Sequence, residues 1–239
     1  MRGVGGLAAL TALGALSAAI YAGALPVAAS LGVEPLAAHP VVFAVLFAVY
    51  LAATWLASAR LRPGGTALSV MLAFGLLFRV LVLPTPVYLS SDIYRYLWDG
   101  RVQLDGVNPY RYPPSAPELG HLRDAEIHPH VNRSSARTVY PPATQWLFAL
   151  SAALAPGSIV GWRVLLLGFE IATVVLLLAL LRRLGAAATG VIAYAWSPLV
   201  VFEGIQAGHV DAALIPVVLL ALLLRQAGSS VAAGATLGV

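Results

Sequence analysis

The chain has 239 residues, of which 60% are hydrophobic and only 10% charged, with a formal net charge of +4. A soluble domain is nearer one quarter charged, so this composition is typical of a protein embedded in a lipid bilayer. Cysteine is absent, which excludes disulfides, thioether-linked haem and thiol catalysis. The positive charge is all arginine and lies mainly beside apolar stretches, which indicates membrane topology rather than nucleic-acid binding.

Apolar runs predict the membrane spans, because about 20 apolar residues cross the hydrocarbon core as a helix. The candidate spans are residues 4–25, 40–59, 66–83, 159–181, 187–205 and 209–224. A further apolar run begins at Ser229 and is cut short at Val239, which is typical of a fragment of a longer protein. The sequence therefore predicts an all-α, multi-pass membrane protein with about six complete spans and a truncated seventh.

Arginines beside the spans predict the orientation, because they mark cytoplasmic ends. Arg2 precedes the first span, and Arg60 and Arg62 follow the second. We therefore expect a plasma-membrane protein with a cytoplasmic N-terminus and with residues 84–158 on the extracytoplasmic side. A cleaved signal peptide in residues 1–25 is the alternative, and it would leave the later orientation unchanged.

The segment 141–156 is either a short span or a helix that lies at the membrane surface. It has 16 residues bounded by prolines, which favours an interfacial helix. In that case Arg182 and Arg183 lie on the cytoplasmic side, and the turn 203–211 is extracytoplasmic. The predicted organisation is three spans in residues 1–83, an outer loop with interfacial helices and the catalytic motif in 84–158, and spans four to seven in 159–239.

The outer loop concentrates charge, since residues 84–140 carry six acids and six arginines, half the charge of the chain. Ser91 can cap a helix that starts with Asp92 and ends near Gly106. One face of this helix is polar and the opposite face apolar, so we expect it to lie flat at the interface. The polar face contains Asp92, Arg95, Asp99 and Gln103, and the apolar face contains Ile93, Leu97 and Leu104.

Two interpretations of this helix stay open. It is a solvated surface helix with internal Asp–Arg pairs, or it is part of an active site. A carboxylate beside the low-dielectric boundary suits proton abstraction from a hydroxyl, and neighbouring arginines can hold a phosphate through two hydrogen bonds. One base and one phosphate clamp at a membrane surface are what group transfer from a lipid-linked phosphate requires.

Three stretches carry a family resemblance: "SDIYRYLWDGRVQLDGVNPYRY" (91–112), "TVYPP" (138–142) and "GHVDA" (208–212). Together they resemble bacterial integral-membrane glycosyltransferases of the GT-C class, closest to family-87-like and polyprenol-phosphate-mannose-dependent mannosyltransferases. The resemblance covers roughly residues 85–225. It implies a GT-C-like helical bundle, a polyprenyl-phosphate-linked hexose, chiefly mannose, as donor, a glycan or glycolipid acceptor, and an inverting reaction with no nucleic-acid partner.

The same resemblance assigns roles to residues. Asp92 matches the presumed general base, although Ser91 stands where many relatives carry a second acid. That departure disfavours a two-carboxylate metal site, so no metal ligand is assigned and a divalent metal cofactor stays open. The candidates for the donor phosphate are Arg95, Arg101 and His209, and those for orienting substrate are Tyr94, Tyr96, Asp99, Tyr140 and Asp211.

Each assignment has a structural alternative. Asp92 also suits a helix N-terminus. Arg95 and Arg101 can instead pair with Asp99 and Asp105. Aromatic side chains at this position also serve as interface anchors. Asp211 and His209 could equally be polar residues at a helix start. The stretch "HLRDAEIHPH" (121–130) has metal-ligand residue types, but its proline-broken sequence favours a solvated loop.

Charges within the spans suggest a second class of function, a transporter or flippase. Glu170 falls mid-span, so it must be protonated or paired, and Arg163 lies about 10 Å away along the helix. We therefore expect a partner for Glu170 on another helix. Arg79 lies near the outer end of its span, where we expect its side chain to extend to the interface.

Overall fold

The computed structural model describes residues 2–61 and 64–238, which form helices and no strand. The longer helices are α1 (Arg2–Ser30), α2 (Pro35–Ala59), α3 (Gly65–Val82), α4 (Asp92–Leu104), α5 (Pro142–Leu154), α6 (Ile159–Arg183), α9 (Leu214–Gln226) and α10 (Ser230–Leu237). The short ones are η1 (Pro117–Leu122), η2 (His128–His130), η3 (Ala188–Val191), α7 (Ile192–Ala195), α8 (Pro198–Val200), the π-helix η4 (Val201–Gln206) and η5 (Val210–Ala213). Arg62 and Val239, which entered the topology predictions, lie outside the described residues.

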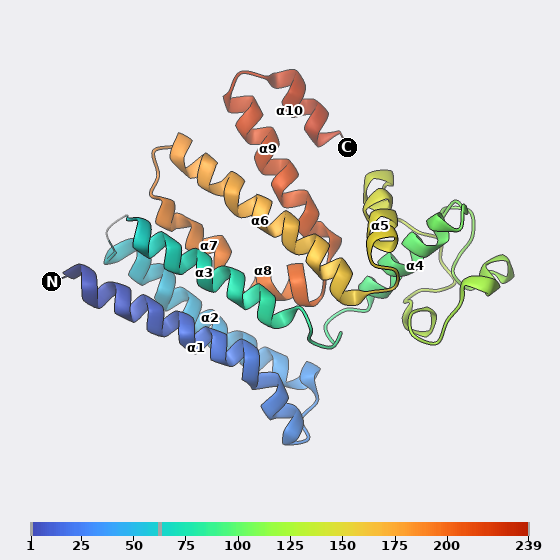
Figure 1. Cartoon of the computed structure of the whole chain (residues 1–239), viewed down its shortest axis with the longest axis horizontal. Helices are drawn as coiled ribbons and strands as arrows, with labels where there is room; N and C mark the ends of the chain where they lie inside the picture. The colour runs from blue at the N-terminus through green and yellow to red at the C-terminus, as the bar shows by residue number, and fades with distance from the viewer. Residues whose placement is uncertain (1, 62–63, 239) are drawn as a thin grey trace.

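The long apolar helices form one bundle, and α4, α5 and the loop between them lie at one end of it (Figure 1). Among the described residues, α1, α2, α3 and α6 are long and apolar enough to cross a membrane. A fifth span results if the bent pair Ala188–Ala195 and Pro198–Gln206 counts as one. Helix α9 has 13 residues, fewer than the roughly 20 of a full span. The protein is thus an all-helical membrane protein with shorter final helices than the sequence predicted.

The first two spans are longer than expected. Helix α1 continues through Pro26 to Ser30, and α2 begins at Pro35 rather than at residue 40. Proline is tolerated at the first helical position, because the N–H that it lacks would have no partner there in any case. The predicted connection 26–39 is therefore only a tight turn around Gly32, whose φ is +75°.

The predicted span 187–205 is broken before Pro198, and its two halves are bent by 51°. Proline cannot donate the helical hydrogen bond, and its ring clashes with the carbonyl one turn earlier. Side chains from other helices use carbonyls next to the break: Arg79 donates to the Ala195 carbonyl (2.8 Å) and Tyr50 to that of Ala193 (3.0 Å). In a bilayer, such partners make irregular backbone tolerable.

An ion pair within the bundle joins α3 to α6. Arg79 Nε and Nη2 donate to one carboxylate oxygen of Glu170 at 3.0 and 2.7 Å, and the Tyr194 hydroxyl donates to the other at 2.8 Å. Glu170 therefore has the partner that its position demanded. The expectation that Arg79 extends to the interface is wrong, because this side chain is only 3% exposed.

Arg163 is fully buried and has no carboxylate partner among the described residues. It donates to the carbonyls of Leu83 (2.9 Å), Thr85 (2.6 Å) and Gln206. The end of α3 and the end of η4 are thereby both attached to α6. Gln206 adds a bond from its side-chain amide to the Pro86 carbonyl (2.8 Å). These bonds hold the segment that leads into α4.

Helix α4 packs tightly against α5. A Cβ atom at Gly100 would lie 2.2 Å from the Phe148 carbonyl oxygen, so only glycine permits this approach. The middle of α4 is buried on both faces, since Asp99 and Leu97 are each 2% exposed. Of the two interpretations, the solvated surface helix is therefore wrong for this part of α4, because Gln145 of α5 donates to Asp99.

Candidate active site

Asp92 is the first residue of α4. Its backbone N–H donates to the Ser90 hydroxyl (3.2 Å), whereas the predicted cap, Ser91, makes no side-chain capping bond. The Asp92 carboxylate accepts a hydrogen bond from the Asn132 amide through one oxygen, and its other oxygen lies 3.7 Å from His209 Nε2. A helix N-terminus favours a carboxylate at this position.

The turn that carries His209 is held against the start of α4. Gly208 has φ +71°, and a Cβ there would lie 2.9 Å from Ile93 Cδ1, so the turn requires glycine for both reasons. The Gly208 carbonyl accepts a hydrogen bond from the Trp162 indole at 2.7 Å. Residues 92 and 209, which the sequence places on the same side of the membrane, therefore lie together at one end of the bundle.

Glu203 fixes the imidazole from the opposite side. The Glu203 carboxylate lies 2.8 Å from His209 Nδ1, and its backbone carbonyl accepts the His209 N–H at 3.0 Å. Glu203 belongs to the π-helix η4, an arrangement often found at functional sites. Asp92, His209 and Glu203 thus form a row in which the imidazole separates two carboxylates.

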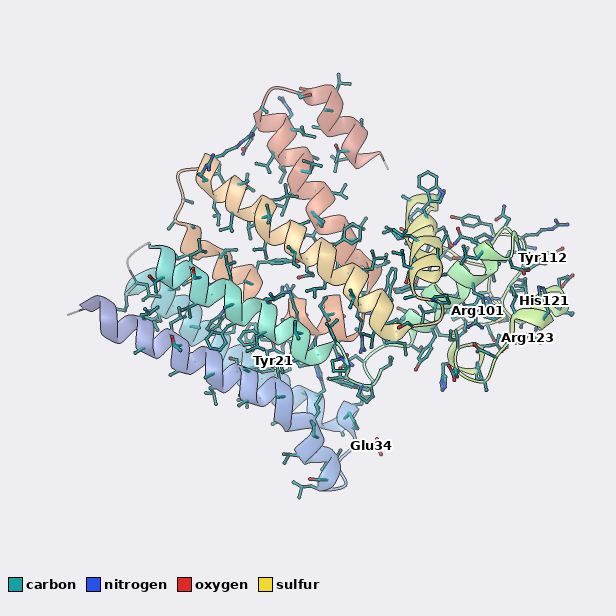
Figure 2. All side chains as sticks on the ribbon, viewed as in Figure 1. Tyr21, Glu34, Arg101, Tyr112, His121 and Arg123 are labelled. Atoms are coloured by element: carbon teal, nitrogen blue, oxygen red, sulfur yellow. The ribbon has the colours of Figure 1, made fainter. Side chains whose placement is uncertain are left out.

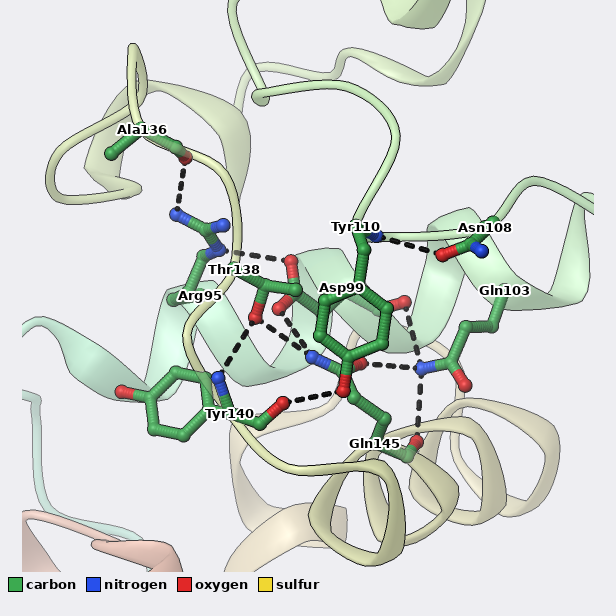
Figure 3. A network of polar contacts seen from close by, with 9 residues as sticks. All are labelled: Arg95, Asp99, Gln103, Asn108, Tyr110, Ala136, Thr138, Tyr140 and Gln145. Atoms are coloured by element: carbon green, nitrogen blue, oxygen red, sulfur yellow. Dashed lines mark hydrogen bonds and ion pairs between the residues drawn. The ribbon is translucent and has the colours of Figure 1, made fainter.

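Further along α4, a hydrogen-bond network links this helix to α5 (Figure 3). Arg95 Nε donates to Asp99 at 2.9 Å, and Arg95 Nη1 donates to the Ala136 carbonyl at 3.1 Å. The Gln145 amide donates to the second oxygen of Asp99 (3.0 Å) and to the Thr138 hydroxyl (2.8 Å). Both carboxylate oxygens of Asp99 therefore accept a hydrogen bond from another side chain, one of them from Arg95.

A cavity of about 270 Å³ opens beside Asp92. Three of its lining residues are arginines and one is an acid. The lining residues are Asp92, Arg95, Asn132, Arg133, Ala136, Arg137, Val139 and Tyr140. Sequence reasoning missed Asn132, Arg133 and Arg137, for which the only signal is two arginines four residues apart in "NRSSAR".

A second cavity, of about 370 Å³, adjoins the other side of the row. Its lining side chains are acidic and apolar, with no arginine among them, whereas the charged side chains of the first cavity are mainly basic. The lining residues are Glu170, Leu199, Val200, Glu203, Gly204, His209, Asp211, Ala212 and Ile215. The predicted candidate Asp211 lies here and not beside Asp92.

The other predicted residues differ in position. Arg101, in the last turn of α4, pairs with Asp124 at 2.6 Å and donates to the Leu122 carbonyl at 2.9 Å, so it lies against the loop that carries His121 and Arg123 (Figure 2). It does not line the cavity at Asp92. Burial of the carboxyl would raise the pKa of Asp124, but the bonds from the Ile127 amide and from Arg101 outweigh it and lower that pKa to about 2.

Two of the predicted tyrosines pack against other rings and the third lines the cavity. Tyr94 packs on His130 (centroids 4.8 Å apart), and Tyr96 is stacked on Phe148 at the same separation. Tyr140 lines the cavity beside Asp92. Burial raises the pKa of both Tyr96 and Tyr140, so both phenols stay protonated and can donate a hydrogen bond.

No group of three or more His, Asp or Glu side chains in the described part of the chain could hold a metal ion. The segment 121–130 makes contacts within itself and with the end of α4. His121 lies 2.8 Å from Asp105, and one oxygen of Asp124 accepts the backbone N–H groups of Glu126, Ile127 and His128 at 2.7 to 3.2 Å. This stretch is an ordered loop that stabilises its own turns.

Comparison with protein-family models matches residues 1–239 to "Alpha-(1->6)-mannopyranosyltransferase, N-terminal domain". The chain belongs to this family. The protein is therefore a membrane glycosyltransferase, and the resemblance to GT-C-like mannosyltransferases is confirmed. Neither the search of curated proteins nor that of solved structures gave a match. For this mannosyltransferase, the row of three side chains and the cavity beside Asp92 form the candidate site.

Proposed function

We propose that this mannosyltransferase moves a mannosyl group from a polyprenyl-phosphate-linked donor to a glycan or glycolipid acceptor, with inversion and with Asp92 as general base. We place the reaction on the extracytoplasmic side of the plasma membrane, within a GT-C-like bundle. The family match supports the sugar, and the three sequence motifs support the donor class. In this proposal Arg95 and His209 act on the donor, and Tyr140 orients a substrate.

One observation carries the proposal: Asp92 opens onto a polar cavity and has no arginine partner among the described residues. Its contacts are a neutral amide and an imidazole. Asp99, by contrast, already accepts from Arg95 and from Gln145. A base needs a free lone pair within reach of the acceptor hydroxyl, and Asp92 retains one. Arg101, held by Asp124, takes no part in the proposed reaction.

The arrangement of the bundle supports the proposed orientation. Arg183, at the end of α6, donates to the Leu223 carbonyl at 2.7 Å, so the ends of α6 and α9 lie together. Arg225 is in the last turn of α9. Arginines therefore collect at the ends of these helices remote from Asp92, as expected for a cytoplasmic side.

The transporter alternative rests on Arg79 and Glu170, and it makes an opposite prediction. A transported anion would need one of these groups to exchange partners during transport. In the structure both groups are bound to each other and to Tyr194 or backbone carbonyls. Transport that survives Asp92→Asn but is lost in Glu170→Gln would favour the transporter.

The test uses membranes that contain the full-length protein, incubated with radiolabelled polyprenyl-phosphate mannose. We expect a mannosylated acceptor with the wild type and none with Asp92→Asn at equal membrane level. Asp105→Asn is the matched control, because Asp105 follows the opposite end of the same helix, and its carboxylate pairs with His121. Transfer retained by Asp92→Asn would overturn the assignment of the base.

A further inference from the structure

The basic cavity contains more positive charge than its own side chains neutralise. Arg133 and Arg137 are both exposed, and neither makes an ion pair or a side-chain hydrogen bond among the described residues. Arg95 is 5% exposed, and its Nη2 is a buried donor with no acceptor. Buried donors in native proteins are almost always paired. An anionic ligand in the cavity would supply the acceptor that Nη2 of Arg95 needs and would offset the charge of Arg133 and Arg137.

The backbone of the segment 131–138 is built to present these arginines. Arg133 has φ +47°, a conformation that costs free energy for a residue with a Cβ. Two bonds anchor the turn: the Ala136 N–H donates to the Arg133 carbonyl (2.8 Å), and the Ala136 carbonyl accepts from Arg95 (3.1 Å). The adjacent Asn132 holds the carboxylate of Asp92. One turn thus positions both the base and the cations.

The charges distinguish a substrate from a product. A sugar–polyprenyl phosphodiester carries one negative charge, whereas a phosphate monoester carries about −1.5 to −2 at neutral pH. Guanidinium groups bind phosphate through paired hydrogen bonds. Three of them around one small cavity are matched to the monoester better than to the diester. Groups that bind the departing charge more strongly than the ground state accelerate the reaction.

We propose that Arg133 and Arg137, together with Nη2 of Arg95, bind the donor phosphate and stabilise the negative charge that develops on it as it leaves. The proposal rests on the function proposed above. The acceptor hydroxyl oxygen forms a bond to the anomeric carbon while the bond from that carbon to the phosphate oxygen breaks. The bonding electron pair stays on the phosphate, and the hydroxyl proton passes to Asp92.

The test measures transfer by the full-length protein in membranes, with polyprenyl-phosphate mannose as donor and polyprenyl monophosphate as product inhibitor. We expect Arg133→Gln and Arg137→Gln each to lower kcat and weaken product inhibition about ten- to a hundredfold, since bonds to charged groups have this effect. The KM for the donor should change much less. Arg111→Gln is the control, because Arg111 is exposed in the same loop but contacts Tyr112.

Loss of folding is separated from loss of charge by Arg133→Gly. Glycine adopts φ +47° without strain, so this variant should be no less stable than the wild type while losing the same transfer activity. Wild-type transfer activity in Arg133→Gly would overturn the proposal. Unchanged product inhibition in both glutamine variants would overturn it as well.

The source of the phosphate is resolved by direct binding of labelled polyprenyl monophosphate, which needs no turnover. Competition by unlabelled polyprenyl monophosphate, but not by inorganic phosphate or by phosphatidylglycerol vesicles, supports the proposal. Equal competition by phosphatidylglycerol would make the cavity a general lipid-headgroup site and overturn it. Arginine-dependent binding without any mannosyl transfer would contradict the proposed function and leave the phosphate site standing.

Discussion

The protein treats its charges differently in two regions. In the bundle, the Arg79–Glu170 pair is buried, and Tyr194 and the carbonyls of Gly75 and Ala195 complete its hydrogen bonds. At the loop end, the charges around the basic cavity are incompletely paired. Asp92 lies 3.7 Å from His209, and Arg133 and Arg137 have no ion-pair partner in the described parts of the chain.

This contrast separates structural from reactive charges. A charged group inside the hydrocarbon region needs protein hydrogen-bond partners, because no water is available there. Charged groups that bind and transform a substrate must instead keep hydrogen-bonding capacity unused until the substrate binds. Hydropathy alone would have singled out Glu170 as the unusual acid, whereas the absence of an arginine partner singles out Asp92 as the candidate reactive acid.

The largest effect on stability is expected in the bundle. Glu170→Gln leaves the Arg79 guanidinium buried without a counter-charge, and breaking such a pair costs about 3–5 kcal/mol. Thermal unfolding of the purified protein in detergent measures this loss. The double change Arg79→Leu with Glu170→Leu should recover much of it, because it removes both charges. Equal instability of the single and the double variants would contradict a purely structural pair.

The junction of α4 and α5 should be the next most sensitive point. Gly100→Ala forces a methyl group against the Phe148 carbonyl, and overpacking of this kind costs about 1–3 kcal/mol. Gly120→Ala is the control, because nothing lies within 4 Å of a Cβ there. Thermal unfolding compares the two, and similar stabilities would show that α4 and α5 are packed less closely than described.

Gln145 connects that junction to the site. Gln145→Leu leaves one oxygen of buried Asp99 without its donor, which costs about 1–3 kcal/mol. Because Asp99 holds Arg95, transfer should fall and product inhibition by polyprenyl monophosphate should weaken. Gln145→Glu, which restores a polar group but not the donor, should not rescue either readout. Unchanged transfer in Gln145→Leu would show that the hydrogen bonds of Gln145 and Asp99 do not affect the phosphate site.

The smallest effect concerns Arg101, whose bond to Asp124 helps to keep the pKa of that carboxyl at about 2. Arg101→Gln should raise this pKa toward 3.8, as followed by NMR titration, and change transfer less than twofold. A carboxyl with a lowered pKa stabilises the fold above about pH 4, and this stabilisation is lost as the pH falls to 2. Arg101→Gln should therefore lose less folding stability than the wild type when the pH falls from 4 to 2. A large loss of transfer would instead return Arg101 to the donor site.

Local patterns were enough to predict the long helices and the helix that begins at Asp92. Apolar runs and a polar stripe at helical spacing are properties of neighbouring residues. The break before Pro198 was missed because the apolar run continues through it, although proline itself was the available signal.

Pairings between distant segments were not predictable in this way. Glu170 needed a partner from its burial, but nothing local indicates Arg79, 91 residues earlier. Arg101 looked equivalent to Arg95 on the helix, yet the loop fold brings Asp124 to it. Arg133 and Arg137 stand in an aperiodic loop, and only the turn around residue 133 places them beside Asp92.

The most direct test compares two variants in one experiment, in which single-turnover mannosyl transfer and thermal unfolding are both measured for Asp92→Asn and Glu170→Gln. We predict that Asp92→Asn keeps its unfolding temperature and loses transfer by roughly two to four orders of magnitude, the range for removal of a general base. Glu170→Gln should show the reverse, a lowered unfolding temperature with transfer by the folded fraction intact. Transfer that survives in Asp92→Asn and disappears in folded Glu170→Gln would contradict the account.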